Sequence, residues 1–247
     1  HNNLRNQTQA RIDEGFIGRD TGRLAHANRT QRQKLIGVGT FDQREFPVSL
    51  TNTLRDFNKA TATTNTSQIG QYNVPVVLVI KKNSSTLKNL LEWLEEHSAT
   101  GATKMVSQPM LLIDDEADNA SVDTGEQLFN EDGTPDEEHS PKTINSLIRK
   151  ILHAFERKAY VGYTATPFAN IFIHRQGETK DEGPDLYPKA FIINLAAPSN
   201  YVGPAKIFGL STPEGRTEGL PLMRLIDDHI NKETPGGWMP VKHSKEH

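Results

Sequence analysis

The sequence predicts an α/β protein with a mostly parallel sheet, because short apolar runs alternate with amphipathic helical segments along the central part of the chain. Two of the apolar runs end in chemically distinctive residues, Asp115-Glu116-Ala117-Asp118 and Gly162-Tyr163-Thr164-Ala165-Thr166-Pro167. Ligands of open parallel sheets bind at the carboxyl ends of the strands. The predicted fold class therefore directs attention to these two motifs.

The composition is that of a globular protein, with 35% hydrophobic and 24% charged residues in a chain of 247. A formal charge of −3 does not indicate a nucleic-acid binder, although a local basic groove would matter more than the total. The absence of cysteine excludes disulfides and thiolate metal sites. No apolar stretch approaches the roughly 20 residues needed to cross a bilayer, so we expect a cytoplasmic protein without a membrane partner.

The first third of the chain gives weaker signals than the rest. Residues 3–16 are compatible with a helix, and residues 17–34 form a polar, arginine-rich connection. We expect a short strand at 35–40, one or two helical turns at 48–57, and a threonine- and asparagine-rich loop at 60–71.

The middle of the chain predicts a strand, a helix and a second strand. The β-branched run 74–80 is typical of a strand buried on both faces of a parallel sheet. Asn83-Ser84-Ser85 offers a helix cap, and leucines at helical spacing follow it. Residues 110–114 are the next strand, and the acidic segment 123–139 is a surface loop.

A helix and three strands are predicted after this loop. Ser140-Pro141 is a good helix start, and an apolar stripe continues from it to Phe155. Residues 160–163, 171–173 and 191–195 are apolar and of strand length.

The adjacent acids of the first motif suit Mg²⁺-dependent phosphoryl transfer. Asp115 is the candidate ligand of the metal, and Glu116 is the candidate for positioning or deprotonating the attacking water. The alternative is a solvated acidic turn without chemistry. The apolar run before it and the second motif favour the functional interpretation.

The second motif offers two hydroxyls in a tight turn that Pro167 ends. We expect Thr164 and Thr166 to lie close to Asp118 and to change hydrogen-bond partners when a γ-phosphate leaves. The alternative is an ordinary strand end.

Both motifs carry a family resemblance. Asp115-Glu116-Ala117-Asp118 resembles the Walker B box of superfamily 2 helicases, and the second motif resembles their motif III. More specifically, the chain resembles the Z1 domain family of endonuclease and ATPase proteins from bacterial restriction and phage-defence loci. The resemblance is carried by 111–121, 163–170, 186–189, 198–201 and the opening residues 2–8, with Gly39-Thr40 and Leu50-Thr51.

The resemblance implies a RecA-like P-loop NTPase fold, a three-layer sandwich, that uses Mg²⁺ and ATP. It implies DNA as a partner, together with a nuclease or another subunit of a restriction system. Asp115 and Glu116 would be the catalytic pair, and Asp118, Thr164 and Thr166 would couple ATP hydrolysis to DNA. Asn3 and Arg5 fall near a helicase motif that contacts the nucleic-acid backbone, whereas the alternative for Arg5 is a solvated surface.

The chain departs from the family pattern in one respect. It contains no Gly-x-x-x-x-Gly-Lys-Ser/Thr sequence, which in relatives binds the β- and γ-phosphates and precedes the segment corresponding to His1. We therefore expect a fragment that holds half of an ATP site. Its RecA-like part would span 1–205, and 206–247 would be a linker or the start of another domain, with 222–230 as an amphipathic patch.

Two other functions stay open. Asp114, Asp115, Glu116 and Asp118 would bind metal directly in a nuclease that needs no nucleotide. The lysine that nucleases often place beside their carboxylates has only a weak match here, Lys142 with Glu138. The other possibility is a noncatalytic DNA-binding or assembly module that retains the fold of an ATPase.

Overall fold

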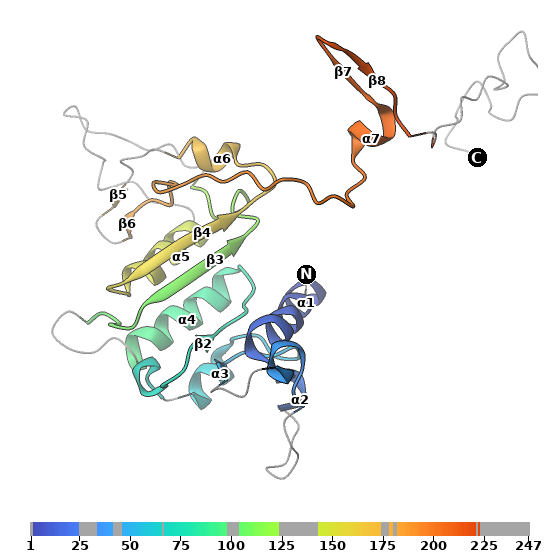
Figure 1. Cartoon of the computed structure of the whole chain (residues 1–247). Coiled ribbons are helices and arrows are strands. Elements are labelled where there is room, and N and C mark those ends of the chain that lie inside the picture. The colour runs from blue at the N-terminus through green and yellow to red at the C-terminus, as the bar shows by residue number, and fades with distance from the viewer. Residues whose placement is uncertain are drawn as a thin grey trace, which may run out of the picture. The chain divides into compact units, whose positions relative to one another are not determined.

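The computed structural model describes residues 2–24, 34–41, 46–65, 67–97, 104–123, 143–173, 178–179, 182–220 and 222. The chain divides into two compact units, residues 1–191 and 192–247. The predicted boundary lies at 205, inside the second unit. Both sequence motifs belong to the first unit (Figure 1).

The chain begins with the predicted helix. Helix α1 (Asn2–Ile12) continues as a π-helical turn, Asp13–Ile17, and then comes the short helix α2 (Thr21–Leu24). The predicted strand at 35–40 is wrong. Leu35 makes a single bridge with Arg19, and Gly37–Thr40 form a 3₁₀ turn. Gly37 turns the chain there with a positive φ of 50°, a conformation that favours glycine.

A short strand occupies the place where helical turns were predicted at 48–57, so that prediction is wrong. Strand β1 (Val48–Ser49) pairs in parallel with β2 (Val76–Val77), which is a shorter strand than the apolar run 74–80 indicates. β-Branched Val48 suits this strand, whose partner lies 28 residues further along the chain.

The threonine-rich segment is partly helical, so the predicted loop at 60–71 is also wrong. It contains α3 (Lys59–Thr64) and a 3₁₀ turn, Ile69–Gln71. The side chain of Asn58 caps α3 by accepting a hydrogen bond from the Thr61 amide at 3.0 Å.

The central elements agree with the sequence. Helix α4 (Ser84–His97) begins after Asn83, whose side chain accepts a bond from the Thr86 amide at 2.9 Å. Strand β3 (Met110–Asp115) pairs in parallel with β4 (Lys158–Tyr163), and α5 (Thr143–His153) lies between them in sequence. The register places Asp115 opposite Tyr163 at the carboxyl end of the pair.

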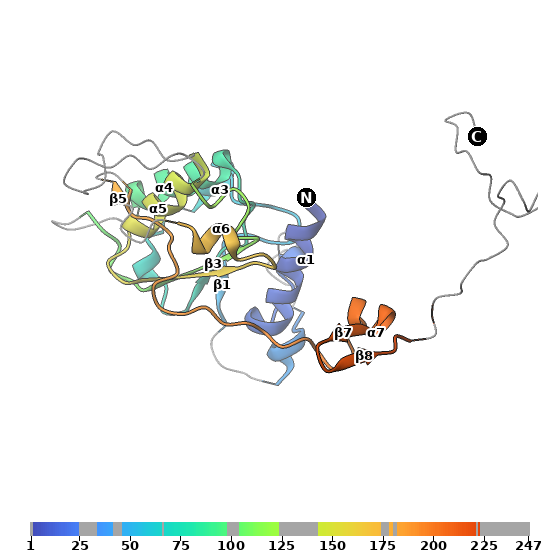
Figure 2. The same ribbon diagram turned by 90° about the horizontal axis from the view of Figure 1, so that it is seen from above.

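The hydrophobic core lies on one face of β3 and β4. Helices α4 and α5 pack against each other there, and Figure 2 shows both on the same side of the sheet. Leu112 and Tyr160 pack against this core. The opposite face is open among the described residues, with Leu111 60% and Ile113 59% exposed. The fully buried members include Phe57, Trp93, Leu94, Val106 and Ile151.

After β4 the predictions fail. The predicted strand at 171–173 is wrong, because α6 (Phe168–Ile171) covers its start. A small antiparallel pair follows, β5 (Glu178–Thr179) with β6 (Gly183–Pro184). The predicted strand at 191–195 is wrong as well, since these residues have no regular structure.

The second unit contains helix α7 (Pro204–Phe208) and a hairpin of β7 (Leu210–Thr212) with β8 (Gly215–Thr217). Predicted features that lie outside the described residues include residues 25–33 of the connection 17–34, the loop beyond residue 123, the Ser140-Pro141 helix start, and the patch 222–230 beyond Leu222.

The described part of the chain is thus a mixed α/β structure with four sheets of two strands each, two parallel and two antiparallel. It does not display the predicted three-layer sandwich. Within the same residues, no helix combines the length and the apolar character needed to span a membrane.

Candidate functional site

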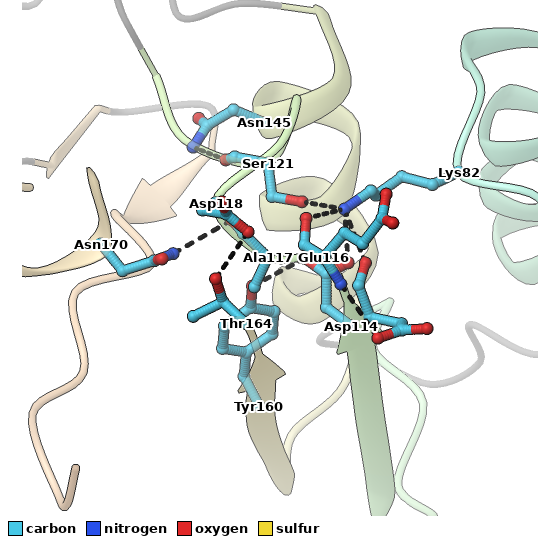
Figure 3. Close-up of polar contacts among 11 residues, drawn as sticks. Lys82, Asp114, Glu116, Ala117, Asp118, Ser121, Asn145, Tyr160, Thr164 and Asn170 are labelled. Carbon is cyan, nitrogen blue, oxygen red and sulfur yellow. Dashed lines mark hydrogen bonds and ion pairs between the residues drawn. The ribbon is translucent and has the colours of Figure 1, made fainter. Parts of the chain in front are cut away.

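The two sequence motifs meet at the carboxyl end of the β3–β4 pair (Figure 3). Residues Asp115 to Ser121, which we call the acid turn, begin at the last residue of β3. The amide of Ala117 donates to the carbonyl of Tyr163, at the end of β4, at 2.9 Å. The parallel arrangement predicted from the sequence therefore brings the motifs into contact.

The backbone of the acid turn is strained at the candidate base. Glu116 has a φ of 53°, in the left-handed region that costs a non-glycine residue about 1–2 kcal/mol. Its carbonyl accepts a hydrogen bond from the Asn119 amide at 2.9 Å. Strain of this kind persists where surrounding contacts determine the conformation, and it is concentrated at functional sites.

Gly162 allows the two motifs to approach closely. A Cβ added at this glycine would lie 2.9 Å from the Cβ of Ala117, closer than side chains tolerate. The absence of a side chain at 162 thus lets β4 lie directly against the acid turn.

A lysine that was not among the predicted site residues connects the acid turn to the segment before α4. Lys82 precedes α4, and its ammonium is 2.9 Å from Asp114 Oδ1 and 2.9 Å from Ser121 Oγ. The same ammonium donates to the carbonyls of Asp115 at 3.0 Å and Glu116 at 2.7 Å. An ammonium has three protons, so these four acceptors use its full capacity.

The carboxylate of Asp114 is buried and fully engaged. Its side chain is 4% exposed, one oxygen pairs with Lys82, and the other accepts the Tyr160 hydroxyl at 2.8 Å. Burial, followed by the neighbouring charge of Asp114, raises the pKa of Tyr160 well above its usual value. Tyr160 therefore stays a neutral donor to Asp114 at physiological pH.

The hydroxyls of the second motif bind Asp118. Thr164 Oγ1 donates to one carboxylate oxygen at 2.6 Å, and Thr166 Oγ1 donates to the other at 2.6 Å. The bond from Thr164, followed by the bond from Thr166, lowers the pKa of Asp118 below its ordinary value. The structure thus brings together the three residues predicted to couple; their coupling role stays a prediction.

Two asparagines hold the rest of the turn. Asn170 on α6 donates to the carbonyl of Ala117 at 3.0 Å, and the buried Asn145 on α5 donates to the carbonyl of Ser121 at 2.9 Å. Contacts from α5, α6, the end of β4 and Lys82, two residues before α4, therefore fix one short turn.

Asp115 and Glu116 differ from the other two acids of the cluster. Both are exposed, and the only hydrogen bond to either carboxylate from the described residues is from the Glu116 amide to Asp115 Oδ1, at 3.1 Å. Within those residues, no three acidic, histidine or cysteine side chains gather as a metal site. An exposed carboxylate fits Mg²⁺, which typically binds one or two carboxylates together with water and phosphate oxygens.

The two residues predicted to contact nucleic acid have different environments. Asn3 is exposed on α1. Arg5 is only 7% exposed, and it donates to the carbonyls of Asn52 at 2.6 Å, Val79 at 3.1 Å and Arg55 at 3.3 Å. Its guanidinium links α1 to the segments that follow β1 and β2. This geometry favours neither a phosphate contact nor a solvated surface; it favours a structural role.

Sequence reasoning missed Lys82, Tyr160, Asn145 and Asn170. One signal could have found Lys82, because it follows the apolar run 74–80 and so lies near the carboxyl end of a predicted strand, as both motifs do. Its saturated contacts distinguish it from a nuclease lysine, which must be free to contact phosphate. The predicted pair Glu138 and Lys142 lies outside the described residues.

Comparisons of this chain with protein-family models, with curated proteins and with solved structures find no match. The resemblance to the Z1 family therefore rests on the motifs themselves.

Proposed function

We propose that the acid turn is the metal-binding and water-activating part of a Mg²⁺-dependent ATP hydrolase that acts on DNA, in a protein of the Z1 type. The observation that carries this proposal is the division among four neighbouring carboxylates. Asp114 and Asp118 are engaged by side chains of the fold, whereas Asp115 and Glu116 are exposed without a side-chain partner among the described residues.

Each acid then has a distinct role. Asp115 holds the metal, and Glu116 accepts a proton from the water that attacks the terminal phosphorus, as ADP departs. Mg²⁺ bound there would neutralise the charge that develops on the phosphate oxygens. Asp118, Thr164 and Thr166 report the state of the nucleotide to the rest of the protein, because their hydrogen bonds join the acid turn to the segment after β4.

The same proposal assigns a RecA-like fold to the first unit. A parallel strand pair with an acidic turn at its carboxyl end and two helices on one face is consistent with a RecA-like sheet. The exposed side chains of Leu111 and Ile113 are consistent with a further layer on the other face. These 247 residues contain no Gly-x-x-x-x-Gly-Lys-Ser/Thr sequence. In this proposal, the lysine that binds the phosphates therefore belongs to a part of the protein outside them.

DNA and a nuclease or another restriction subunit are the proposed partners, and a DNA partner implies the cytoplasm. Asn3 remains a candidate for contact with the DNA backbone. Arg5 is left out, because its guanidinium is buried against main-chain carbonyls.

The decisive test compares Glu116→Gln with the wild type in Mg²⁺-dependent ATP hydrolysis, with and without DNA, both in the full-length protein that includes the phosphate-binding lysine. Loss of the base should lower kcat by about 10²–10⁴-fold while leaving KM nearly unchanged. Glu95→Gln, an equivalent change on the exposed side of α4, is the control and should keep full activity. Equal hydrolysis by Glu116→Gln and the wild type would refute the assignment.

The wild type and Asp115→Asn separate the two other functions. If the wild type cleaves plasmid DNA with Mg²⁺ in the absence of ATP and Asp115→Asn does not, the result would favour a direct metal-dependent nuclease. That function is the weaker one, because each carboxylate oxygen of Asp114 and Asp118 already accepts a hydrogen bond from a side chain of the fold. DNA binding with no hydrolysis of ATP or DNA would favour an assembly module.

A further inference from the structure

Lys82 is the most connected side chain at the acid turn, yet the proposed reaction gives it no chemical step. Its ammonium reaches four oxygens within 3.0 Å, on Asp114, Asp115, Glu116 and Ser121. Two of these oxygens are the main-chain carbonyls of the proposed metal ligand and the proposed base. Lys82 therefore acts on the backbone that carries both catalytic side chains.

We infer that Lys82 is a positioning residue, which holds Glu116 in its left-handed conformation and so fixes the base relative to the water it activates. The inference rests on the proposed function for its catalytic meaning, but the contact itself is independent of it. Figure 3 shows the ammonium of Lys82 directed into the turn, with dashed contacts to the residues around it.

Two alternative roles fit the geometry less well. A lysine that binds phosphate needs free N–H groups, whereas the three protons of Lys82 face four acceptors of its own chain. A lysine that only neutralises Asp114 needs one contact, and Tyr160 already supplies a second donor to that carboxylate. The two carbonyl contacts are explained by neither role.

The two carbonyl contacts of Lys82 stabilise the strained backbone at Glu116. The carbonyl of Glu116 accepts both the Lys82 ammonium at 2.7 Å and the Asn119 amide at 2.9 Å, so the peptide plane after the base is fixed from two directions. Without the ammonium, the φ of 53° loses one of the contacts that maintain it. The turn would then sample other conformations, and Glu116 would move with it.

Removal of Lys82 alone would leave Asp114 as a buried charge without its ion-pair partner, and such a protein could fail to fold. The test therefore uses Asp114→Asn as its background, which removes the charge but keeps the ammonium on the carbonyls. Lys82→Cys is added to this background. Because these 247 residues contain no cysteine, the new thiol is the only one among them, and alkylation with 2-bromoethylamine converts it into an isostere of lysine.

The first measurement is hydrogen exchange of peptides that cover the acid turn, where the amides of Ala117 and Asn119 are hydrogen-bonded. We expect exchange at least about tenfold faster in Lys82→Cys/Asp114→Asn than in Asp114→Asn, and a return to the slower rate after aminoethylation. Carbamidomethylation, which adds no charge, should not restore it. Unchanged exchange in the double variant would overturn the inference, whether or not the protein hydrolyses ATP.

The second measurement is ATP hydrolysis by the full-length protein that carries Asp114→Asn, by the double variant and by the double variant after aminoethylation. Misplacement of the base should lower kcat by about 10²-fold with little change in KM, and aminoethylation should recover it. Lys81→Cys, treated in the same way, is the matched control, since within the described residues the adjacent lysine donates from its main-chain amide, to Asp56, and makes no contact with the acid turn. Faster exchange with an unaltered kcat would reduce Lys82 to a purely structural residue and would also overturn the inference. If the full-length wild-type protein, which includes the phosphate-binding lysine, has no hydrolysis at all, the proposed function fails, while the exchange result still decides on the contact.

Discussion

At the scale of single residues, the acid turn separates four similar side chains by their partners. Two threonine hydroxyls occupy both oxygens of Asp118, and Lys82 with Tyr160 occupies both oxygens of Asp114. A carboxylate with such donors is held in one orientation. The exposed acids between them, Asp115 and Glu116, are therefore the ones to which we assign the proposed chemistry, on the basis of their neighbours and not of their residue type.

The threonine contacts predict an altered titration of Asp118. In Thr164→Val/Thr166→Val, whose side chains keep their shape, the pKa of Asp118 should rise toward the ordinary value of 3.8, because both bonds favour the ionised form. The measurement is the pH dependence of the ¹³C chemical shift of the Asp118 carboxyl. Thr63→Val on α3 is the control, since that hydroxyl donates to the carbonyl of Lys59 in its own helix and not to Asp118.

The sign of the stability effect follows from the same shift. A folded-state pKa below the unfolded one stabilises the protein above the unfolded value, and this contribution is lost as pH falls through the folded value. The wild type should therefore exceed the double variant in free energy of unfolding at neutral pH, and the difference should shrink below pH 3.8. An equal titration of Asp118 in both proteins would contradict the assigned hydrogen bonds.

At the scale of elements, the contact between β4 and the acid turn depends on one missing side chain. Gly162→Ala would place a methyl group 2.9 Å from the Cβ of Ala117, so either β4 or the turn must shift. Overpacking of this kind should lower the free energy of unfolding by about 1–3 kcal/mol, measured by urea denaturation.

Gly15→Ala provides the matched comparison, because a Cβ at that glycine has no atom within 4 Å. The added methyl group should leave stability unchanged or raise it by about 0.4–1 kcal/mol, through a less flexible unfolded chain. Equal effects of the two substitutions would show that β4 and the turn are not in close contact.

The elements that the sequence predicted correctly are those with strong local signals. Asn83 marks the start of α4, and the leucines at helical spacing keep it on the core. The predictions of secondary structure fail where the pairing strand is distant in the sequence, or where a local side-chain contact starts a helix that the composition does not indicate. Val48 becomes a strand because Val76 lies beside it, and the threonine-rich α3 is helical with its start capped by the side chain of Asn58.

The candidate site was likewise predictable where its signals are local in the sequence. Adjacent acids and paired hydroxyls at the ends of two apolar runs were visible in the sequence, and a parallel sheet brings such ends together. The ammonium of Lys82 could not be assigned to the turn, since its partners lie 32 to 39 residues away. The burial of Arg5 was equally hidden, because the carbonyls it binds are 47 to 74 residues distant.

At the scale of the whole first unit, a buried arginine joins α5 to the segment around β5 and β6. Arg149 is 2% exposed and donates to Thr179 Oγ1 at 3.1 Å, to the carbonyl of Gly183 and to Asn145 Oδ1 at 3.4 Å. Burial lowers the pKa of Arg149, and the nearby acids Asp185 and Glu182 oppose this effect. The charge is thus held inside the fold by the carbonyl of Gly183 and by the nearby acids Asp185 and Glu182.

Arg149→Met should destabilise the unit strongly, because it leaves buried acceptors and acids without their partner. We expect a loss of about 3–5 kcal/mol in the free energy of unfolding, measured by urea denaturation. The adjacent Lys150 is the natural control. It pairs with Glu182 at 3.2 Å from a side chain that is 37% exposed, so Lys150→Met should cost only about 0–1 kcal/mol. A similar loss in both variants would contradict a special role for the buried charge.

The distances along the chain between the acid turn and its partners have a consequence for when the site exists. Ser121 and Asn145 are 24 residues apart, and Ala117 and Asn170 are 53 apart, so none of these bonds can form within a local segment. Each requires a loop of the chain to be closed first, at an entropic cost that only the assembled core offsets. The turn is therefore a property of the finished fold: opening of α5, α6 or the segment around Lys82 would dissolve it, and any probe bound there would read out the integrity of the unit as a whole.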